Sequence, residues 1–250
     1  MKKRKWIIFI SSILILEGIA LLGLSAIGGK KSQAENKPHA YNTKRNREQK
    51  ALKIYEKNKD ALILVNARYG LDESYDARLR TICNGRLQAS KRIYKSLSKM
   101  LEAAGEQGFH YWIASAWRNR EKQQQLIDED TTKLVKKGAS RKEALIETYR
   151  ETMPAGHSEH ETGLALDVLC TGNTNMDVSQ DKEPGNHWLQ KNCHRYGFIL
   201  RYPKDKEDIT GINYEPWHFR YVGREAATYM KKHNLTLEEF WDELGFTPED

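Results

Sequence analysis

Two short segments of this sequence concentrate side chains that can bind a metal ion. The first, Ser158–Asp167, carries polar groups that run directly into an apolar stretch ending on Asp167. A strand of this composition is buried, and an isolated ionised carboxylate at its end is costly to desolvate. A bound cation would supply the partner that this carboxylate needs. His160 offers an imidazole ligand in the same segment.

The second segment lies about fifty residues later, where Glu215 and His218 stand three residues apart. Pro216 favours an extended conformation at Glu215, so the pair does not lie on a helix as the ligands of an H-E-x-x-H motif do. A catalytic zinc commonly takes three protein ligands and keeps one position for water. His160, Asp167 and His218 meet that count, and Glu215 is left over as a general base.

The residues alone leave other assignments of the histidines open. A histidine in a folded domain is usually a surface residue or a hydrogen-bonded core residue, and the eight in this sequence allow accidental pairs. His157 is the rival ligand because it stands three residues before His160. It follows a glycine and has no carboxylate at a matching spacing, so the pattern favours His160.

Sequence periodicity predicts the elements that position both segments. Residues 120–136 are typical of a polar helix, Ser140 and Glu143 form a capping box for another, and Thr236 with Glu239 caps a last one. Helices and strands mix without a regular alternation, which favours an α+β domain with a small, mostly antiparallel sheet flanked by helices. The expected strands are 62–65, 109–115, 163–169, 198–202 and 217–222, and further helices are expected within 87–105 and 186–196.

The N-terminus carries a membrane-targeting pattern. Lys2–Lys5 are all basic and precede Trp6–Gly29, a 24-residue stretch whose only charge is Glu17. As a helix this stretch would cover about 36 Å, enough to cross a hydrocarbon core of about 30 Å, and it exceeds the apolar region of a signal peptide. We therefore expect a single-pass anchor in the cell membrane, with the tip in the cytoplasm and the rest of the chain extracellular. A cleaved signal peptide, with a weak site at 32–34, is the alternative.

The basic excess of the chain is confined to its beginning. Residues 1–50 hold 11 basic and 3 acidic side chains, whereas the other 200 hold 30 and 31, against a net charge of +7 for the whole. No nucleic-acid partner is expected, because the exported part has no basic excess for a phosphate backbone. The polar residues 32–60 are typical of a stalk. The expected divisions are a cytoplasmic tip and anchor at 1–31, a stalk at 32–60 and a catalytic domain at 61–250.

The cysteine content is low and does not define the fold. Cys83, Cys170 and Cys193 lack the paired spacing of a structural zinc site or a redox motif. An exported chain permits one disulfide, and Cys170 with Cys193 is the pair to examine first. Buried free thiols are the alternative.

The sequence resembles the VanY-type D-alanyl-D-alanine carboxypeptidases, zinc peptidases of peptidoglycan whose family also includes L,D-carboxypeptidases. The family's S-x-H-x-x-G-x-A-x-D pattern stands here as Ser158–Asp167, and its E-P-W-H pattern as Glu215–His218. Its S-x-x-R pattern, with a glutamine five residues after the arginine, stands as Ser115, Arg118 and Gln123. The order and spacing of all three agree with the family.

The resemblance covers about residues 61–245 and has few departures. Ala116 and Trp117 replace the usual Gly-Tyr before the arginine, and Cys193 stands where alanine is common. None of these positions is a proposed ligand. The implied fold is that of the zinc D,D-peptidases.

The resemblance implies a zinc-dependent amide hydrolysis. His160, Asp167 and His218 would hold Zn²⁺, which polarises the scissile carbonyl and acidifies a water. Glu215 would take the proton of that water and pass it to the leaving amine. The implied reaction removes the C-terminal D-amino acid from the stem peptides of peptidoglycan.

Three further residues are implied to contact the substrate. Arg118 has a planar fork suited to a terminal carboxylate or to the tetrahedral oxyanion, and Gln123 and Ser158 can add neutral hydrogen bonds. On chemistry alone, a surface salt bridge is an equal alternative for Arg118. The resemblance favours the site role.

Two other functions stay open at this point. The same zinc site could act as an L,D-carboxypeptidase on tetrapeptide stems, because a few side chains at the rim decide which bond is cut. Alternatively, the domain could be an inactive zinc-bound module that binds the cell wall, since a fold does not fix a function. The presence of Glu215 argues against the inactive module, because a structural metal needs no base.

Overall fold

A computed structural model describes residues 37–246, with side chains described from residue 44 onward. The compact unit of the chain begins at His39. The basic tip and the apolar stretch that predict a membrane anchor lie outside the described residues. Among the helices within 37–246, none combines the length and the apolar character needed to cross a membrane.

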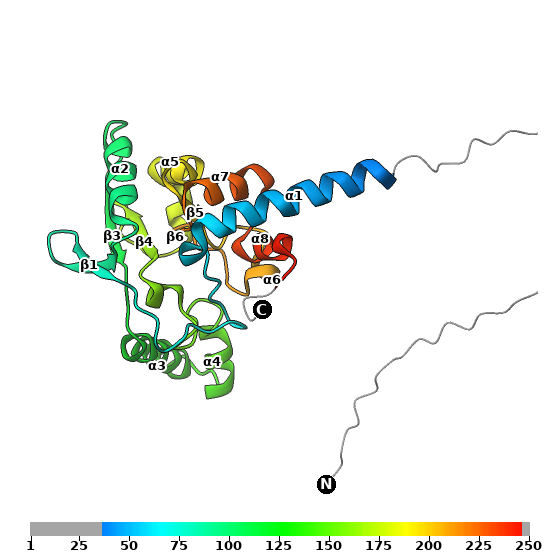
Figure 1. The fold of residues 1–250 in the computed structure, drawn as a ribbon. Coiled ribbons are helices and arrows are strands. Elements are labelled where there is room, and N and C mark those ends of the chain that lie inside the picture. The colour runs from blue at the N-terminus through cyan, green and yellow to red at the C-terminus, as the bar shows by residue number, and fades with distance from the viewer. Residues whose placement is uncertain (1–36, 247–250) are drawn as a thin grey trace, which may run out of the picture. The chain divides into compact units, whose positions relative to one another are not determined.

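A four-stranded antiparallel sheet forms the centre of the unit, in the order β3-β4-β6-β5 (Figure 1). This confirms the predicted α+β class with a small antiparallel sheet. A separate antiparallel hairpin pairs β1 with β2. The strands are β1 (Leu79–Ile82), β2 (Leu87–Ser90), β3 (Tyr111–Ser115), β4 (Ala165–Cys170), β5 (Phe198–Leu200) and β6 (His218–Tyr221).

The two faces of the central sheet differ in chemistry. Leu166 and Val168 of β4 and Phe219 of β6 belong to a buried apolar cluster that also includes residues of α2 and α5. Because side chains alternate along a strand, Asp167 and His218 lie on the opposite face. The sheet therefore has one face for the core and one face that can hold polar chemistry.

Helices surround the sheet, and several keep their predicted boundaries. The helix at 120–136 and the capping boxes of Ser140 with Glu143 and of Thr236 with Glu239 are confirmed. The α-helices are α1 (Lys37–Asn58), α2 (Tyr94–Gly105), α3 (Arg120–Lys136), α4 (Arg141–Thr148), α5 (Pro184–Asn192), α6 (Glu207–Thr210), α7 (Arg224–His233) and α8 (Leu237–Leu244). The 3-10 helices are η1 (Lys59–Ala61), η2 (Glu159–Thr162), η3 (Val178–Lys182) and η4 (Cys193–Tyr196).

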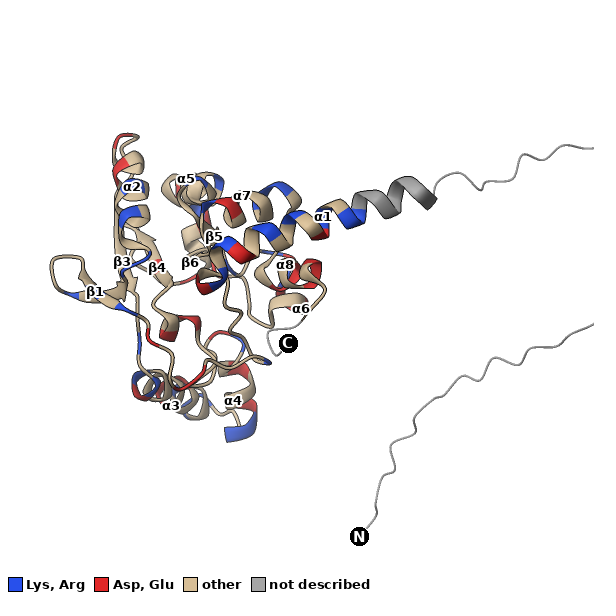
Figure 2. Ribbon diagram, in the orientation of Figure 1, with Lys and Arg blue, Asp and Glu red and all other residues tan. Residues whose placement is uncertain are grey.

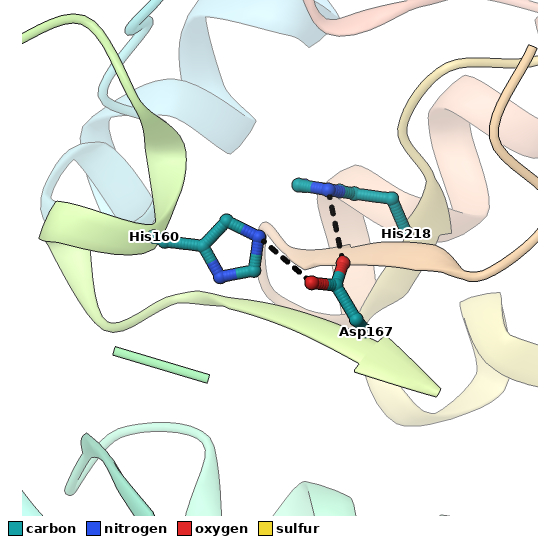
Figure 3. Close-up of side chains that lie close together, drawn as sticks. All are labelled: His160, Asp167 and His218. Atoms are coloured by element: carbon teal, nitrogen blue, oxygen red, sulfur yellow. Dashed lines mark ion pairs between the residues drawn. The ribbon is translucent and has the colours of Figure 1, made fainter. Parts of the chain in front are cut away.

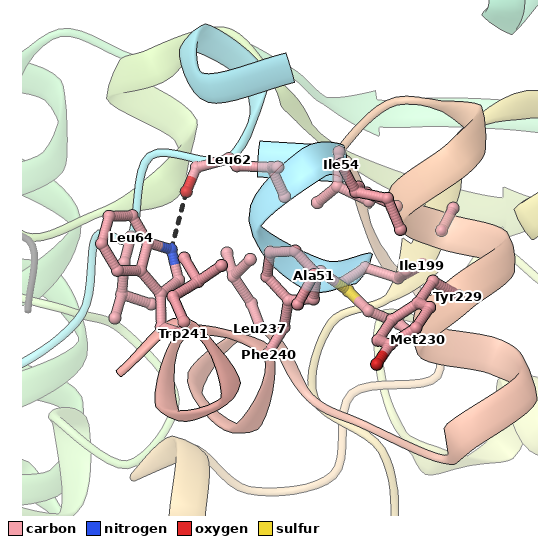
Figure 4. Close-up of a cluster of buried hydrophobic side chains, with 14 residues drawn as sticks. Ala51, Ile54, Leu62, Leu64, Ile199, Tyr229, Met230, Leu237, Phe240 and Trp241 are labelled. Carbon is pink, nitrogen blue, oxygen red and sulfur yellow. Dashed lines mark hydrogen bonds between the residues drawn. The ribbon is translucent and has the colours of Figure 1, made fainter. Parts of the chain in front are cut away.

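The segment expected as a stalk is helical over most of its length. Figure 1 shows α1 running alongside α7 and α8, and Ala51 and Ile54 are buried in a second apolar cluster with residues of both helices (Figure 4). The folded unit therefore begins well before residue 61. The composition did not predict a packed helix here, because Lys and Arg recur along the described part of α1 (Figure 2) and large apolar residues are concentrated in its last turns.

The expected strand at 62–65 is also not a strand. Two of its carbonyls instead accept hydrogen bonds from side chains. Trp241 Nε1 donates to the carbonyl of Leu62 at 2.8 Å (Figure 4), and Arg220 Nη2 donates to that of Ile63 at 2.8 Å. The start of the predicted helix at 87–105 is likewise corrected. Residues 87–90 pair with β1 around a turn at Cys83–Gly85, in which all three residues have positive φ. The helix begins only at Tyr94.

The predicted disulfide between Cys170 and Cys193 does not form, and all three cysteines are free thiols. Cys170 and Cys193 are both buried. Burial raises the pKa of Cys170 to about 11 and that of Cys193 to about 12. Both thiols are therefore protonated and inert near neutral pH.

Candidate metal centre

The three predicted metal ligands come together on the polar face of the sheet. His160 lies on η2, Asp167 on β4 and His218 at the start of β6, where Asp167 and His218 are direct partners across the two strands. Their side chains point toward one another (Figure 3), and one ligand atom from each lies within 4.8 Å of the other two. His160 Nε2 is 3.3 Å from Asp167 Oδ2, and His218 Nδ1 is 3.4 Å from Asp167 Oδ1.

Gly163 makes the turn that joins η2 to β4. Its φ of +69° lies in the left-handed region, which favours glycine. A Cβ at this position would also stand 2.9 Å from the backbone nitrogen of Ser90, which donates to the carbonyl of Gly163 at 2.9 Å. The glycine therefore sets the angle at which His160 approaches Asp167.

The donor atoms fit a metal such as zinc. His160 Nδ1 lies 2.6 Å from the carbonyl of Ala116, so the protonated Nδ1 leaves Nε2 free to act as a ligand. Asp167 Oδ1 is buried and has no hydrogen-bond partner among the described residues. Burial opposes ionisation of Asp167, but His160 and His218 hold its pKa well below the usual range. Two imidazoles and one carboxylate are a common ligand set of catalytic zinc.

The surroundings of His218 also call for a cation. Burial lowers the pKa of His218, but the nearby carboxylates of Asp167, Glu159 and Glu215 raise it well above the ordinary value. Three carboxylates thus face one buried imidazole. A positive charge at this point satisfies them, either as a proton or as a metal ion.

Glu215 stands beside the ligand cluster. Its Oε2 lies 3.4 Å from His218 Nδ1, and the residue is 5% exposed. Burial raises the pKa of Glu215 to about 7, with Asp167 adding to the effect and His218 and Arg118 opposing it. A carboxylate with this pKa can accept and return a proton near neutral pH.

Arg118 is held in a fixed orientation next to the cluster. Its Nη1 donates to Ser115 Oγ at 2.9 Å and lies 3.6 Å from Asp167 Oδ2. Its Nε donates to Gln123 Oε1 at 3.0 Å. Nη2 has no hydrogen bond to any described residue and is left for a ligand.

The substrate contact predicted for Gln123 is not what the structure supports. Gln123 is fully buried, and its Nε2 donates to the carbonyl of Met153 at 2.7 Å while its Oε1 accepts from Arg118. Both ends of the amide are therefore used within the protein. Gln123 orients Arg118 and does not line the cavity.

A cavity of about 540 Å³ opens onto the cluster. It is lined by the three metal-ligand candidates, by Glu215, Arg118 and Ser115, and by Ser158, Trp117, Tyr202 and Met176. Ser158 lies on this lining, and its contact with a ligand stays a prediction. His157 is absent from the lining, because its Nδ1 bonds to the carbonyl of Asn66 at 2.7 Å. The rival ligand is therefore excluded by position.

Sequence reasoning missed two residues of the site. Tyr202 packs its ring 4.8 Å from that of His218. Glu159 is fully buried beneath His218, and Arg201 and Arg220 hold its pKa well below the usual value although burial opposes this. Glu159 sits inside the motif between Ser158 and His160, but no spacing rule marks that position as functional.

Comparison with known proteins places this chain in a family. Residues 86–224 match the family model of VanY, D-alanyl-D-alanine carboxypeptidase. A D-alanyl-D-alanine carboxypeptidase of Enterococcus faecalis is 39% identical over 182 residues, which cover 72% of this chain and 65% of that protein. The chain thus matches slightly less than two thirds of that relative's length.

Two solved structures extend the likeness to the fold. A variant of the vancomycin-resistance D,D-pentapeptidase VanY in complex with Zn(II) is 38% identical, with a TM-score of 0.66, and the match covers 72% of this chain and 98% of that one. VanYB in complex with D-alanine-D-alanine is 38% identical, with a TM-score of 0.67 and coverage of 73% and 97%.

Proposed function

This chain belongs to the VanY family of D-alanyl-D-alanine carboxypeptidases, and on that premise we propose that it removes the C-terminal D-alanine from peptidoglycan stem peptides in a zinc-dependent hydrolysis. The observation that carries the proposal is the position of Glu215, a buried carboxylate 3.4 Å from His218 at the edge of the ligand cluster. A metal that only stabilised the fold would need no base at this point.

The metal ligands and Glu215 have distinct tasks in the proposed reaction. His160, Asp167 and His218 hold the zinc, which when bound acidifies a water and polarises the scissile carbonyl. Glu215 accepts the proton of the attacking water and donates it to the leaving amine. The pKa of about 7 at Glu215 suits both transfers.

Arg118 binds the charge at the end of the substrate. Its Nη2 can donate to the terminal carboxylate or to the developing oxyanion, while Ser115 and Gln123 hold the other nitrogens. Ser158 lines the same cavity and offers a neutral hydrogen bond. A free C-terminal carboxylate is the feature that distinguishes a carboxypeptidase substrate from an internal peptide bond, and a fixed guanidinium is suited to recognise it.

The experiment that tests the function uses two substrates. Purified protein loaded with zinc is incubated with a pentapeptide stem ending in D-Ala-D-Ala and, separately, with the tetrapeptide stem that lacks the last residue. Mass spectrometry then identifies what is released. Release of one D-alanine from the pentapeptide alone supports the proposal, release from the tetrapeptide indicates the L,D-carboxypeptidase, and release from neither indicates a wall-binding module.

The proposal includes a location. We expect residues 1–31 to anchor the chain in the cell membrane and the catalytic domain to face the peptidoglycan outside, because Lys2–Lys5 precede a long apolar stretch. Protease added to intact spheroplasts should remove the domain. Survival of the domain, in a sample where a known external protein is cleaved, would contradict this topology.

A further inference from the structure

Glu159 occupies a position under the metal centre that the reaction described above does not use. It is the first residue of η2, its side chain is fully buried, and its Oε2 lies 3.5 Å from His218 Nε2. Neither of these two atoms has a hydrogen-bond partner elsewhere among the described residues. Glu159 Oε2 and His218 Nε2 are therefore each other's nearest polar partner.

Two buried guanidinium groups fix the other oxygen of Glu159. Its Oε1 accepts from Arg201 Nε at 2.7 Å and from Arg220 Nη1 at 2.6 Å. Arg201 is in turn held by both oxygens of Glu238 on α8, at 2.8 and 2.6 Å. Arg220 is held by the carbonyl of Ile63 at 2.8 Å. Both arginines are fully buried, so the carboxylate is kept charged and cannot rotate away from His218.

A carboxylate at Nε2 decides which nitrogen of His218 carries the proton. It favours the tautomer in which Nε2 carries the proton and points it at the carboxylate, which leaves the lone pair on Nδ1, the nitrogen that faces Asp167 at 3.4 Å. His160 is arranged in the opposite sense, with Nδ1 bonded to the carbonyl of Ala116 and Nε2 facing Asp167. Each imidazole is thus oriented by a partner behind it.

We propose that Glu159 is a positioning residue, which holds the ring of His218 in the tautomer and orientation required to bind the metal through Nδ1. The inference rests on the proposed function only in taking His218 as a zinc ligand. Partners of this kind typically raise metal affinity by about 10-fold to 100-fold. The same contact could instead serve only the stability of the arginine network, so the test must separate the two roles.

Glu238→Gln is the matched control for Glu159→Gln. Both changes remove one carboxylate charge from buried Arg201 at nearly constant size. Among the described residues, however, Glu238 bonds only to Arg201 and Asn66 and makes no contact with His218. Zinc affinity is measured on each folded variant by competition with a chromophoric chelator, and unfolding temperature is measured alongside. We expect Glu159→Gln to weaken zinc binding about 10-fold to 100-fold, and Glu238→Gln to leave it within about 2-fold while lowering the unfolding temperature.

Two results would overturn the inference. One is a zinc affinity of Glu159→Gln equal to that of the parent. The other is an equal loss of affinity in both variants, which would assign the effect to the network as a whole.

The parent protein provides a test that does not depend on any variant folding. Nitrogen-15 NMR of zinc-loaded protein labelled at histidine should show His218 protonated at Nε2, with Nδ1 shifted by the metal. Protonation at Nδ1 would contradict the inference. These readouts involve no peptide, so they can fail while stem peptides are hydrolysed, or succeed while no stem peptide is cut.

Discussion

The Oε2 atom of Glu215 and the Oδ1 atom of Asp167 each lie 3.4 Å from Nδ1 of His218. One nitrogen thus stands between the carboxylate that is assigned to the metal and the carboxylate that is assigned to the proton. Asp167 reaches this point through strand pairing with His218, and Glu215 through the short segment that leads into β6. The proximity of base and ligand follows from the register of β4 and β6.

Zinc content should depend on His218 and not on His157. His218→Ala removes one of three ligands and should lower bound zinc well below one per chain, as measured by elemental analysis. His157→Ala is the control, because His157 bonds to the carbonyl of Asn66 outside the cavity. Treatment with a chelator should also lower the unfolding temperature, since Asp167 loses its counter-charge. Loss of zinc in His157→Ala would reassign the ligands.

Arg118→Ala should raise KM on the pentapeptide with zinc content unchanged. A hydrogen bond to a charged group contributes about 1.5 to 3 kcal/mol, which corresponds to roughly 10-fold to 150-fold in kcat/KM. Part of the loss should appear in KM because the terminal carboxylate is present before and during the reaction.

Gln123→Met should produce a smaller change of the same kind. Gln123 does not line the cavity, so any effect on KM must pass through the orientation of Arg118. Steady-state rates of both variants, with zinc measured in parallel, check this pair. Unchanged kinetics in Gln123→Met would show that Arg118 needs no such support.

The contribution of α1 to the fold can be measured at two neighbouring positions. Ile54 is 6% exposed within the cluster formed by α1, α7 and α8, so Ile54→Ala should lower the free energy of unfolding by about 2 to 5 kcal/mol. Leu52 is 41% exposed on the same helix, and Leu52→Ala should change it by no more than about 0.5 kcal/mol. Urea denaturation compares the two. Equal stability of both variants would contradict the packing of α1 against the domain and would support the predicted stalk.

Much of the fold can be predicted from patterns of neighbouring residues. The helix at 120–136 and the two capping boxes are encoded by neighbouring residues, and the structure keeps them. The three metal ligands could also be predicted, because a buried carboxylate at the end of an apolar strand needs a positively charged or hydrogen-bonding partner. The prediction of a stalk at 32–60 is wrong for a different reason. Ala51 and Ile54 pack against helices more than 170 residues later in the chain, and no local sequence pattern indicates such a partner.

The roles of Gln123 and Glu159 could not be read from the sequence. Gln123 was predicted to contact substrate and Glu159 carried no prediction, yet both are fully buried and bonded to arginines. Their roles depend on the side chains that they contact, Arg118 for Gln123 and His218 for Glu159. That relation exists only after β4, β5, β6 and α3 have packed.

The most direct test of the account compares the parent with Glu215→Gln. Glutamine keeps the size and hydrogen bonding of the side chain but cannot accept the proton, so only the contribution of the base should disappear. We expect release of D-alanine from the pentapeptide to fall about 10²-fold to 10⁴-fold. Bound zinc and unfolding temperature should stay at the parent values. A variant that holds zinc and releases D-alanine as fast as the parent would contradict the assignment of Glu215 and, with it, the proposed reaction.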